Sequence, residues 1–217
     1  MTMESLVEAP DRRMAGRPRC DRTMQAILAA AYAILAEKGM AGFSIEGVAQ
    51  RAGSAKTTIY RWWPSKGALA VEAFFQAMGP LLPLPRSDAG APLDELRDQL
   101  RALASALNSP VGVILSDLIA EGQRSPDIQA ALIEGYLTPR RALMRQILER
   151  GITAGQVRAD IDLSVTLDAL FGAIAGRALM WGRPLDLAWV DRLADTVFRG
   201  ILVDQALGRA GPVAASA

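Results

Sequence analysis

The chain contains no histidine and only one cysteine among its 217 residues. A lone cysteine cannot form an internal disulfide, and zinc sites are built mainly from cysteine and histidine, so the composition argues against structural zinc. Histidine is also the most common general acid or base in enzymes. No nucleotide-binding loop and no nucleophile motif are present. We therefore expect a protein that is not an enzyme and that holds no metal or cofactor.

Long hydrophobic runs and strand patterns are also missing. No apolar run approaches the 18 residues of a membrane span, and residues 1–20 carry arginine and proline where a secretion signal would be apolar. We therefore expect a cytoplasmic protein without a membrane partner. No segment alternates apolar and polar residues with β-branched enrichment. Because 51% of the residues are apolar, a substantial core is available, and the sequence predicts an all-α fold.

The net charge of +1 hides an asymmetry along the chain. Residues 1–66 contain 10 basic and 6 acidic residues, a net charge of +4. The remaining residues contain 14 basic and 17 acidic residues, a net charge of −3. This division suits an N-terminal part that meets phosphates and a C-terminal part that does not.

The stretch from Ser44 to Lys66 predicts two short helices joined by a tight turn. Ser44 is suited to cap the first helix, and apolar residues follow it at helical spacing. Gly53 can adopt the left-handed backbone conformation that a sharp turn requires, and Ser54 is placed to cap the second helix. Ile59 would then lock the second helix onto the first. This spacing is typical of a helix-turn-helix.

Residues 53–66 read GSAKTTIYRWWPSK, and this run resembles the DNA-binding segment of the tetracycline-repressor (TetR) family of bacterial transcriptional regulators. The resemblance covers residues 22–69, and beyond it only the general pattern of helices agrees. Two departures concern Ser54-Ala55, where the family more often has an apolar residue and then serine, and the bulky run 62–64. The resemblance implies an N-terminal three-helix DNA-binding unit joined to a larger helical ligand-binding and dimerisation domain.

Four parts follow from these signals. We expect a basic flexible arm at residues 1–20, a helix-turn-helix head at 21–66, a helical effector-binding and dimerisation body at 67–210, and a disordered tail at 211–217. Helical periodicity, with glycine and proline at the ends, predicts helices at 22–38, 92–108, 110–123, 126–150 with a kink near Pro139, 163–181 and 187–207.

The resemblance also implies DNA contacts for individual residues. Lys56, Thr57 and Arg61 would approach base edges. Core packing is the alternative for the two tryptophans, and it is preferred for Trp63. Residues implied to hold the phosphate backbone are Ser44, Thr58, Tyr60, Trp62 and Lys66.

The basic arm ahead of the first helix allows two interpretations. Residues 16–19, extended by Pro18, could place Arg17 or Arg19 in a narrow, electronegative minor groove. The alternative is a tail that is merely solvated.

The body carries a candidate dimer interface and a candidate pocket, each with ordinary core packing as its alternative. A small-residue strip on one helix and an apolar stripe on the last would let a second copy approach: Ala169, Gly172, Ala173, Gly176, Leu193, Val197 and Ile201. Apolar residues beyond the needs of bundle packing could line an effector pocket: Phe74, Phe75, Met78, Leu103, Leu107, Ile114, Leu118, Met144, Phe171 and Trp181.

The resemblance therefore implies a ligand-responsive transcriptional regulator and favours a repressor. It would bind palindromic double-stranded operator DNA as a homodimer and be released by a small lipophilic effector. Two alternatives stay open at this point. One is a small helical enzyme or carrier with a vestigial head, and the other is a constitutive DNA-binding protein whose cavity is too small for a ligand.

Overall fold

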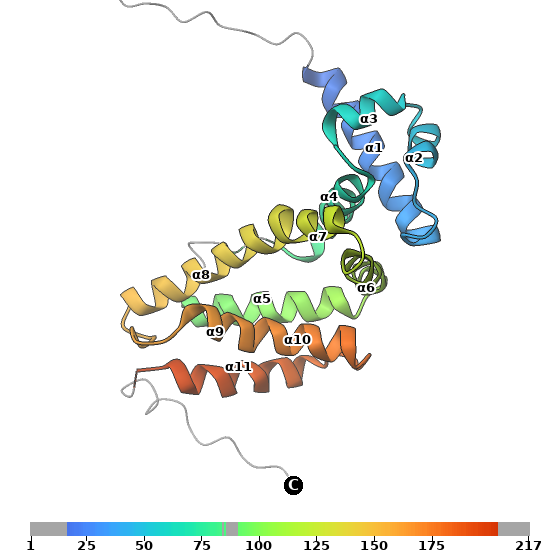
Figure 1. The fold of residues 1–217 in the computed structure, drawn as a ribbon. Helices are drawn as coiled ribbons and strands as arrows, with labels where there is room; N and C mark the ends of the chain where they lie inside the picture. The colour runs from blue at the N-terminus through green and yellow to red at the C-terminus, as the bar shows by residue number, and fades with distance from the viewer. Residues whose placement is uncertain (1–16, 84, 86–90, 204–217) are drawn as a thin grey trace, which may run out of the picture.

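The computed structural model describes residues 17–83, 85 and 91–203. These residues are almost entirely helical and form no strand, and the one isolated bridge among them joins Val157 and Leu202. The all-α prediction is confirmed. Figure 1 shows a small helical head packed on one end of a longer bundle. The helices are α1 (Arg17–Lys38), α2 (Ile45–Ala52), α3 (Lys56–Trp62), α4 (Lys66–Met78), α5 (Pro92–Leu107), α6 (Pro110–Gly122), α7 (Pro126–Leu132), α8 (Thr138–Thr153), α9 (Leu163–Leu167), α10 (Ala173–Ala175) and α11 (Leu187–Ile201).

Helix α1 begins earlier than the sequence predicted. The backbone is already helical at Arg17, so Arg17 and Arg19 lie in the first helical turn and not in an extended arm. Pro18 does not prevent this, because first-turn N–H groups have no intrahelical partner and the fixed φ of proline suits a helix start. The predicted extension of residues 16–19 is therefore wrong for 17–19. The rest of the arm, and the tail at 211–217, lie outside the described residues.

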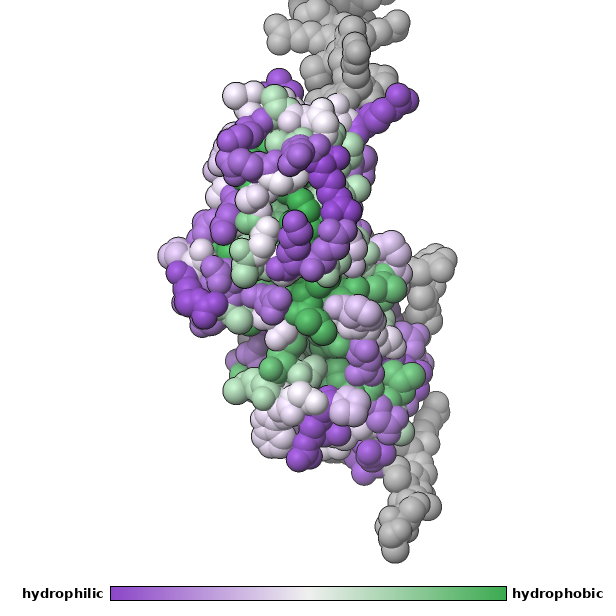
Figure 2. All heavy atoms as spheres, turned by 90° about the vertical axis from the view of Figure 1, so that its right-hand side faces the viewer, coloured by the Kyte–Doolittle hydropathy of each residue, from purple (hydrophilic) through white to green (hydrophobic). Residues whose placement is uncertain are grey.

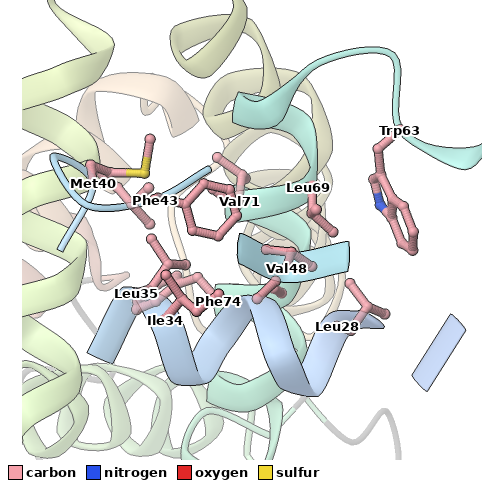
Figure 3. Packing of buried hydrophobic residues seen from close by; sticks show 14 of the residues in the cluster. Leu28, Ile34, Leu35, Met40, Phe43, Val48, Trp63, Leu69, Val71 and Phe74 are labelled. Atoms are coloured by element: carbon pink, nitrogen blue, oxygen red, sulfur yellow. The ribbon is translucent and has the colours of Figure 1, made fainter. Parts of the chain in front are cut away.

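The head is held together by apolar residues of α1, α2 and α3 that pack onto α4. Figure 3 shows Leu28, Ile34 and Leu35 of α1 facing Leu69 and Phe74 of α4. The same hydrophobic cluster continues into α6 and α7, through Val111, Ile114, Leu118, Ile128 and Leu132. The core of the head therefore includes side chains from the body.

Three body helices begin at the prolines that the sequence indicated, Pro92, Pro110 and Pro126. The predicted kink near Pro139 corresponds to a π-helical segment, η2 (Ile133–Leu137), between α7 and α8. Pro139 has no N–H to donate to the carbonyl four residues earlier. A wider π turn immediately before it accommodates the interruption without ending the helix.

Helices α9 and α10 join two further π-helical segments, η3 (Asp168–Gly172) and η4 (Gly176–Met180), in one rod. By length and composition alone, Leu163–Met180 is apolar enough to cross a membrane, which corrects the expectation that no run approaches this length. Helices α5 and α6 pass the same test only as a pair bent by 87°. Only 22% of the Leu163–Met180 window is buried, so the rod presents an apolar face that no described residue covers.

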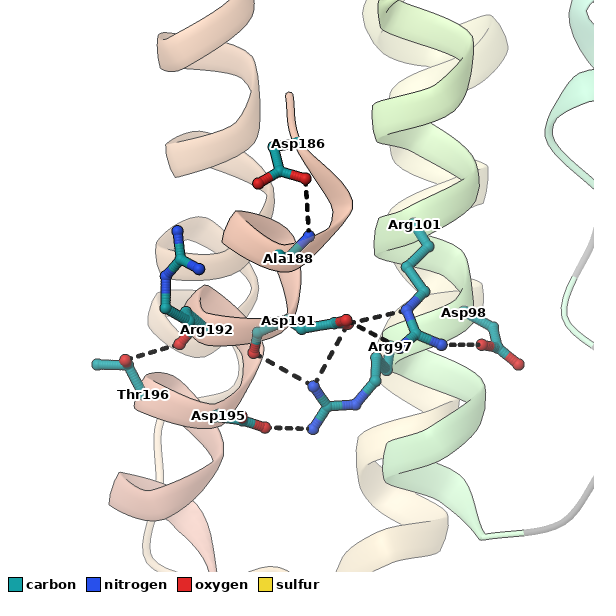
Figure 4. A network of polar contacts seen from close by, with 9 residues as sticks. All are labelled: Arg97, Asp98, Arg101, Asp186, Ala188, Asp191, Arg192, Asp195 and Thr196. Atoms are coloured by element: carbon teal, nitrogen blue, oxygen red, sulfur yellow. Dashed lines mark hydrogen bonds and ion pairs between the residues drawn. The ribbon is translucent and has the colours of Figure 1, made fainter. Parts of the chain in front are cut away.

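A polar network joins α5 to α11 (Figure 4). The Arg101 Nε atom donates to Asp191 Oδ1 at 2.8 Å, and Arg97 Nη2 donates to Asp195 Oδ1 at 2.6 Å. The hydrogen bond from Arg101, with the nearby positive charge of both arginines, holds the pKa of Asp191 below its ordinary value. This network fixes the last helix along the bundle and so positions the outer face of the body.

Candidate DNA-binding face and effector cavity

The turn between α2 and α3 is built largely as predicted. The Ser44 side chain caps α2 by accepting a hydrogen bond from the backbone N–H of Gly47 at 3.1 Å. Gly53 has a φ of 61°, in the left-handed region that favours glycine, and its N–H bonds to the carbonyls of Ala49 and Gln50. An added Cβ at Gly53 would meet nothing within 4 Å, so conformation and not space requires glycine.

The predicted cap at Ser54 is wrong. The N-cap residue of α3 is Ala55, and no side chain caps this helix. The backbone N–H of Ser54 instead donates to the carbonyl of Ala49, so Ser54 completes the end of α2.

Helix α3 buries one side and exposes the other. Ile59 is fully buried, and Trp63, directly after the helix, is only 2% exposed, which confirms the core position predicted for both. The three predicted base-contact residues, Lys56, Thr57 and Arg61, are all exposed. Their contact with DNA stays a prediction, and their position on one free helical surface is what that contact requires.

The predicted phosphate-contact residues surround this surface. Lys66 is exposed at the first position of α4, where the Ser65 hydroxyl caps the helix by accepting from the N–H of Ala68 at 3.1 Å. Tyr60 is 53% exposed. The remaining three, Ser44, Thr58 and Trp62, are half-buried.

Thr58 and Trp62 lie together in a shallow hollow between α1 and α3. The Arg61 guanidinium lies 5.4 Å from the centre of the Trp62 ring and lines the same hollow. Thr23 of α1 and residues 53–55 complete its wall. The hollow therefore brings a cation, a hydroxyl and an indole together at the edge of α3, which we call the reader helix. Such a combination is suited to phosphate contacts.

Lys56 has a partner that sequence reasoning missed. Its Nζ atom lies 2.5 Å from Glu46 Oε1, so the first turns of α2 and α3 are joined by an exposed ion pair. The hydrogen bond between them lowers the pKa of Glu46 and raises that of Lys56. Ten residues separate the two, and only the turn at Gly53 brings them together. Lys56 must leave this carboxylate to reach a base.

We predict that Glu46→Gln tightens binding to DNA by about 2- to 5-fold, the scale of one exposed charge interaction. The substitution frees Lys56 and removes a carboxylate from a surface that meets phosphates. Fluorescence anisotropy with labelled duplex at fixed salt measures the change. The matched control is Glu37→Gln, which alters the net charge equally but breaks the exposed pair with Arg51. Equal gains in both variants would contradict a specific role for Glu46.

Trp63 connects the reader helix to α4. Its Nε1–H donates to Glu72 Oε2 at 2.7 Å, and its ring meets that of Trp62 edge-on with centroids 5.6 Å apart. A buried indole with its N–H satisfied is a rigid packing element. The orientation of α3 is therefore coupled to that of α4.

Helix α4 is in turn held by the start of α7. The Asp127 carboxylate is partly buried, which acts to raise its pKa, but hydrogen bonds involving Ser65 and Ser125 outweigh this and hold that pKa below its ordinary value. Gly67 lets the two helices approach, since an added Cβ would lie 2.6 Å from Asp127 Oδ2 and 2.6 Å from Ile128 Cγ1. The body therefore touches the DNA-proximal end of α4 directly.

The body contains a partly open, apolar cavity of about 420 Å³ beside the other end of α4. Its wall comes from α4, α5, α6, the η2–α8 segment and the rod formed by α9 and α10. This volume falls in the range of small-molecule sites. Six of the predicted pocket residues line it: Phe75, Met78, Leu103, Leu107, Met144 and Phe171.

The other four predicted pocket residues lie elsewhere. Phe74, Ile114 and Leu118 belong to the hydrophobic cluster that packs the head. Trp181 is 69% exposed just beyond η4 and does not line the cavity. On α6, the residues one position later, Leu115 and Ile119, face the cavity instead. Both sides of these helices are apolar, so the sequence pattern could not separate core from cavity.

Five polar residues of the cavity wall were not predicted: Gln99, Tyr136, Thr138, Arg140 and Arg141. The predicted pocket was defined by apolar composition, which carries no signal for them. Of the five, Arg141 pairs with Asp168 at 2.7 Å.

The candidate dimer residues largely lie on an open face. Ala169 and Gly172 are exposed, and Ala173, Gly176, Leu193 and Val197 are half-buried. An added Cβ at Gly172 or Gly176 would meet nothing within 4 Å. Ile201 is an exception, since it is 6% exposed within the bundle core and is not available to a partner.

Exposed apolar side chains extend along the outside of the bundle. Val165 is 63% exposed and Met180 is 82% exposed. Figure 2 faces another side, the end of the bundle beneath the head, and hydrophobic residues also gather in the middle of that view. Exposed apolar residues that gather together mark candidate contact surfaces.

Comparisons with known proteins agree with this geometry. Residues 27–73 match the family described as "Bacterial regulatory proteins, tetR family", and residues 86–197 match "Tetracyclin repressor-like, C-terminal domain". The chain is 33% identical over 186 residues to the uncharacterized HTH-type transcriptional regulator YdeS of Bacillus subtilis, covering 86% of this chain and 93% of that protein. It is 28% identical over 172 residues to the DNA-binding transcriptional repressor TetR of Mycobacteroides abscessus, covering 79% and 90%.

Among solved structures, the TetR family transcription regulator SCO0332 superimposes with a TM-score of 0.69 at 35% identity. The match covers 84% of this chain and all of that one. Proteins of this kind regulate transcription and are not enzymes, which removes the catalytic alternative. From the two matched segments, the full-length relatives and the exposed reader helix, we conclude that this chain belongs to the TetR family of bacterial transcriptional regulators.

Proposed function

We propose that the protein is a cytoplasmic repressor that binds a palindromic operator as a homodimer and is released by a small lipophilic effector. The observation that carries the proposal is the free face of α3, where Lys56, Thr57 and Arg61 are exposed while Ile59 and Trp63 fix the helix from behind. A short helix in the major groove offers only three or four side chains to bases. Lys66 beside it supplies a phosphate contact at a helix N-terminus.

Dimerisation is supported by the apolar face of the α9–α10 rod. A two-fold pair would place two reader helices one turn of duplex apart, as palindromic half-sites require. Small residues at 169, 172, 173 and 176 allow close helix approach, and Leu193 and Val197 of α11 extend the surface. We accordingly propose that residues 21–66 form the DNA-binding head and that residues 67–210 form the effector-binding and dimerisation body. The α9–α11 face is the proposed dimer interface.

The cavity supports regulation by a ligand and argues against a constitutive DNA-binding protein. Phe75 and Met78 of α4 form part of its wall, and the other end of α4 carries Lys66 beside the reader helix. An effector that binds better when α4 is displaced would draw the two reader helices out of register. The reciprocal consequence is that operator must weaken effector binding by the same factor.

Selection of bound fragments from genomic DNA by the purified protein tests the proposal. A recovered site with two-fold symmetry is expected. Failure to prefer any fragment over bulk competitor at moderate ionic strength would refute it.

Two variants of the reader surface separate base reading from phosphate contact. Lys66→Ala should weaken binding to all DNA sequences alike. It should also reduce the slope of the logarithm of the DNA-binding constant against the logarithm of salt concentration by about 1, because one phosphate contact is lost. Lys56→Ala should instead change the relative affinities within a panel of operator variants. Anisotropy titrations across the panel at several salt concentrations measure both. Indistinguishable behaviour of the two variants would show that the division of roles is wrong.

A further inference from the structure

One corner of the apolar cavity contains a half-buried cation. Arg140, in the first turn of α8, donates from Nη1 to the carbonyl of Leu82 at 3.2 Å. Its Nη2 donates to the carbonyl of Pro83 at 3.2 Å and to Gln99 Oε1 at 2.5 Å. All three acceptors are neutral. Within the described residues, Arg140 forms no ion pair, which would need a carboxylate oxygen within 4.0 Å of its guanidinium.

A half-buried guanidinium without a counter-ion is unfavourable for the fold. Burial lowers the pKa of Arg140, yet arginine keeps its charge in proteins. Buried charges are ordinarily paired, because removing an ion from water without a counter-ion is strongly unfavourable. The half-exposed Arg141 pairs with Asp168, and Arg150 pairs with the buried carboxylate of Glu95. Arg140 differs from both.

A second polar group lies at the same corner. The hydroxyl oxygen of Tyr136 is buried beside the Arg140 guanidinium, and no described residue other than Arg140 interacts with it. Burial raises the pKa of Tyr136, and the nearby positive charge of Arg140 and its hydrogen bond act in the opposite direction with less effect. The phenol is therefore neutral and carries an O–H that can donate. The cavity wall thus holds a cation and a hydroxyl at one corner where no described carboxylate pairs with the cation.

The cavity volume of about 420 Å³ lies in the range of sites for small molecules. Away from Arg140 and its polar neighbours the wall is apolar, with Phe75, Leu103 and Met144 among its residues. A ligand that fills it therefore combines one anionic end with a hydrophobic body of medium length.

We propose that the effector is an amphipathic carboxylate whose anionic group accepts hydrogen bonds from Arg140 and Tyr136 and whose apolar body fills the rest of the cavity. Nη2 already donates both of its hydrogens, so the carboxylate would accept from Nε–H or from the second N–H of Nη1, and charge-assisted bonds of this kind are the strong ones. The assignment rests on the proposed function only in calling this compound the effector.

The same corner is joined to α4. The Tyr136 ring stacks on Phe75, with centroids 3.4 Å apart and an interplanar angle of 6°. Tyr136 lies in η2, a π-helical turn, and such turns occur frequently at functional sites. A carboxylate that bonds the Tyr136 hydroxyl therefore acts on a ring in direct contact with the helix that leads to the DNA-binding head.

Binding of three ten-carbon probes to the full-length protein without DNA tests the inference. Decanoate, decanol and decyltrimethylammonium, each below its micelle concentration, are compared by isothermal titration calorimetry. We expect decanoate to bind about 10-fold or more tighter than decanol, the scale of charge-assisted hydrogen bonds, and the cation to bind weakest. Equal binding of decanoate and decanol, or preference for the cation, would overturn the proposal.

Substitutions locate the preference. Arg140→Gln should bring the affinity for decanoate within about threefold of the affinity for decanol, and Arg140→Lys should keep part of the preference. Arg141→Gln, which removes a paired arginine of the same wall, is the matched control and should keep all of it. If Arg140→Gln does not fold, Tyr136→Phe should still reduce decanoate affinity about 3- to 10-fold. A preference that survives both Arg140→Gln and Tyr136→Phe contradicts the assignment.

Adding operator duplex distinguishes this inference from the proposed function. If the protein prefers a carboxylate but selects no operator, the cavity assignment stands and the proposed repressor function is refuted. If it selects an operator but shows no carboxylate preference, the repressor function stands and the cavity assignment is refuted. With both correct, operator should weaken decanoate binding, and decanoate should weaken operator binding by the same factor.

Discussion

Replacing Trp63 by alanine is expected to lower the free energy of unfolding by about 3–5 kcal/mol, the usual cost of deleting a large aromatic side chain from a core. The side chain is 2% exposed and closes the end of α3 onto α4. Its loss leaves a void between the two helices and removes the hydrogen bond to Glu72. Urea denaturation followed by circular dichroism, at one protein concentration, measures the effect.

Trp63→Phe separates packing from hydrogen bonding. It keeps an aromatic ring in the core but cannot donate to Glu72, so a smaller loss of about 1–2 kcal/mol is expected. Operator affinity should follow the same order, because the orientation of α3 depends on this anchor. A fully stable Trp63→Ala variant would mean that another contact sets the position of the reader helix.

The second large effect is expected at Gly67. An alanine there would place Cβ 2.6 Å from Ile128 Cγ1, and Ile128 is fully buried and cannot move aside freely. Helix α7 must then shift away from the first turn of α4. Overpacking of this kind lowers the free energy of unfolding by about 1–3 kcal/mol. Because Lys66 lies in that turn, operator affinity should also fall. Urea denaturation and operator titration of the same sample measure both losses.

Gly135→Ala is the matched control for Gly67→Ala. Gly135 lies in η2, where an added Cβ would meet nothing within 4 Å. In an open helical position, replacing glycine by alanine stabilises by up to about 1 kcal/mol, since alanine loses less conformational freedom on folding. Equal losses in both variants would show that the close approach of α4 and α7 has no special role.

Features that depend on neighbouring residues in sequence could be predicted. The turn at Gly53 is local, because its positive φ and the cap at Ser44 are decided within a few residues. Proline fixed the starts of α5, α6 and α7 in the same way. Burial of Ile59 and Trp63 followed from the helical period once the turn was placed.

Features that depend on packing between distant segments could not be predicted. Leu118 and Ile119 are equally apolar, and only the position of α4 decides that one packs the head and the other faces the cavity. Arg140 bonds to carbonyl groups 57 and 58 residues away in the sequence. Lys56 pairs with Glu46 only because of the turn between them. Trp181 was misplaced because the helical pattern gives no sign that the rod ends at the surface.

The shared core of the head and of helices α6 and α7 bears on the construction of chimaeric regulators. A head grafted onto a foreign body at residue 78 would lose Val111, Ile114, Leu118, Ile128 and Leu132 as packing partners, and the transplanted α1 and α4 would meet a surface not shaped for them. Grafts that carry α6 and α7 along with residues 17–78 would keep this apolar contact intact, so the natural unit of exchange is discontinuous in the chain.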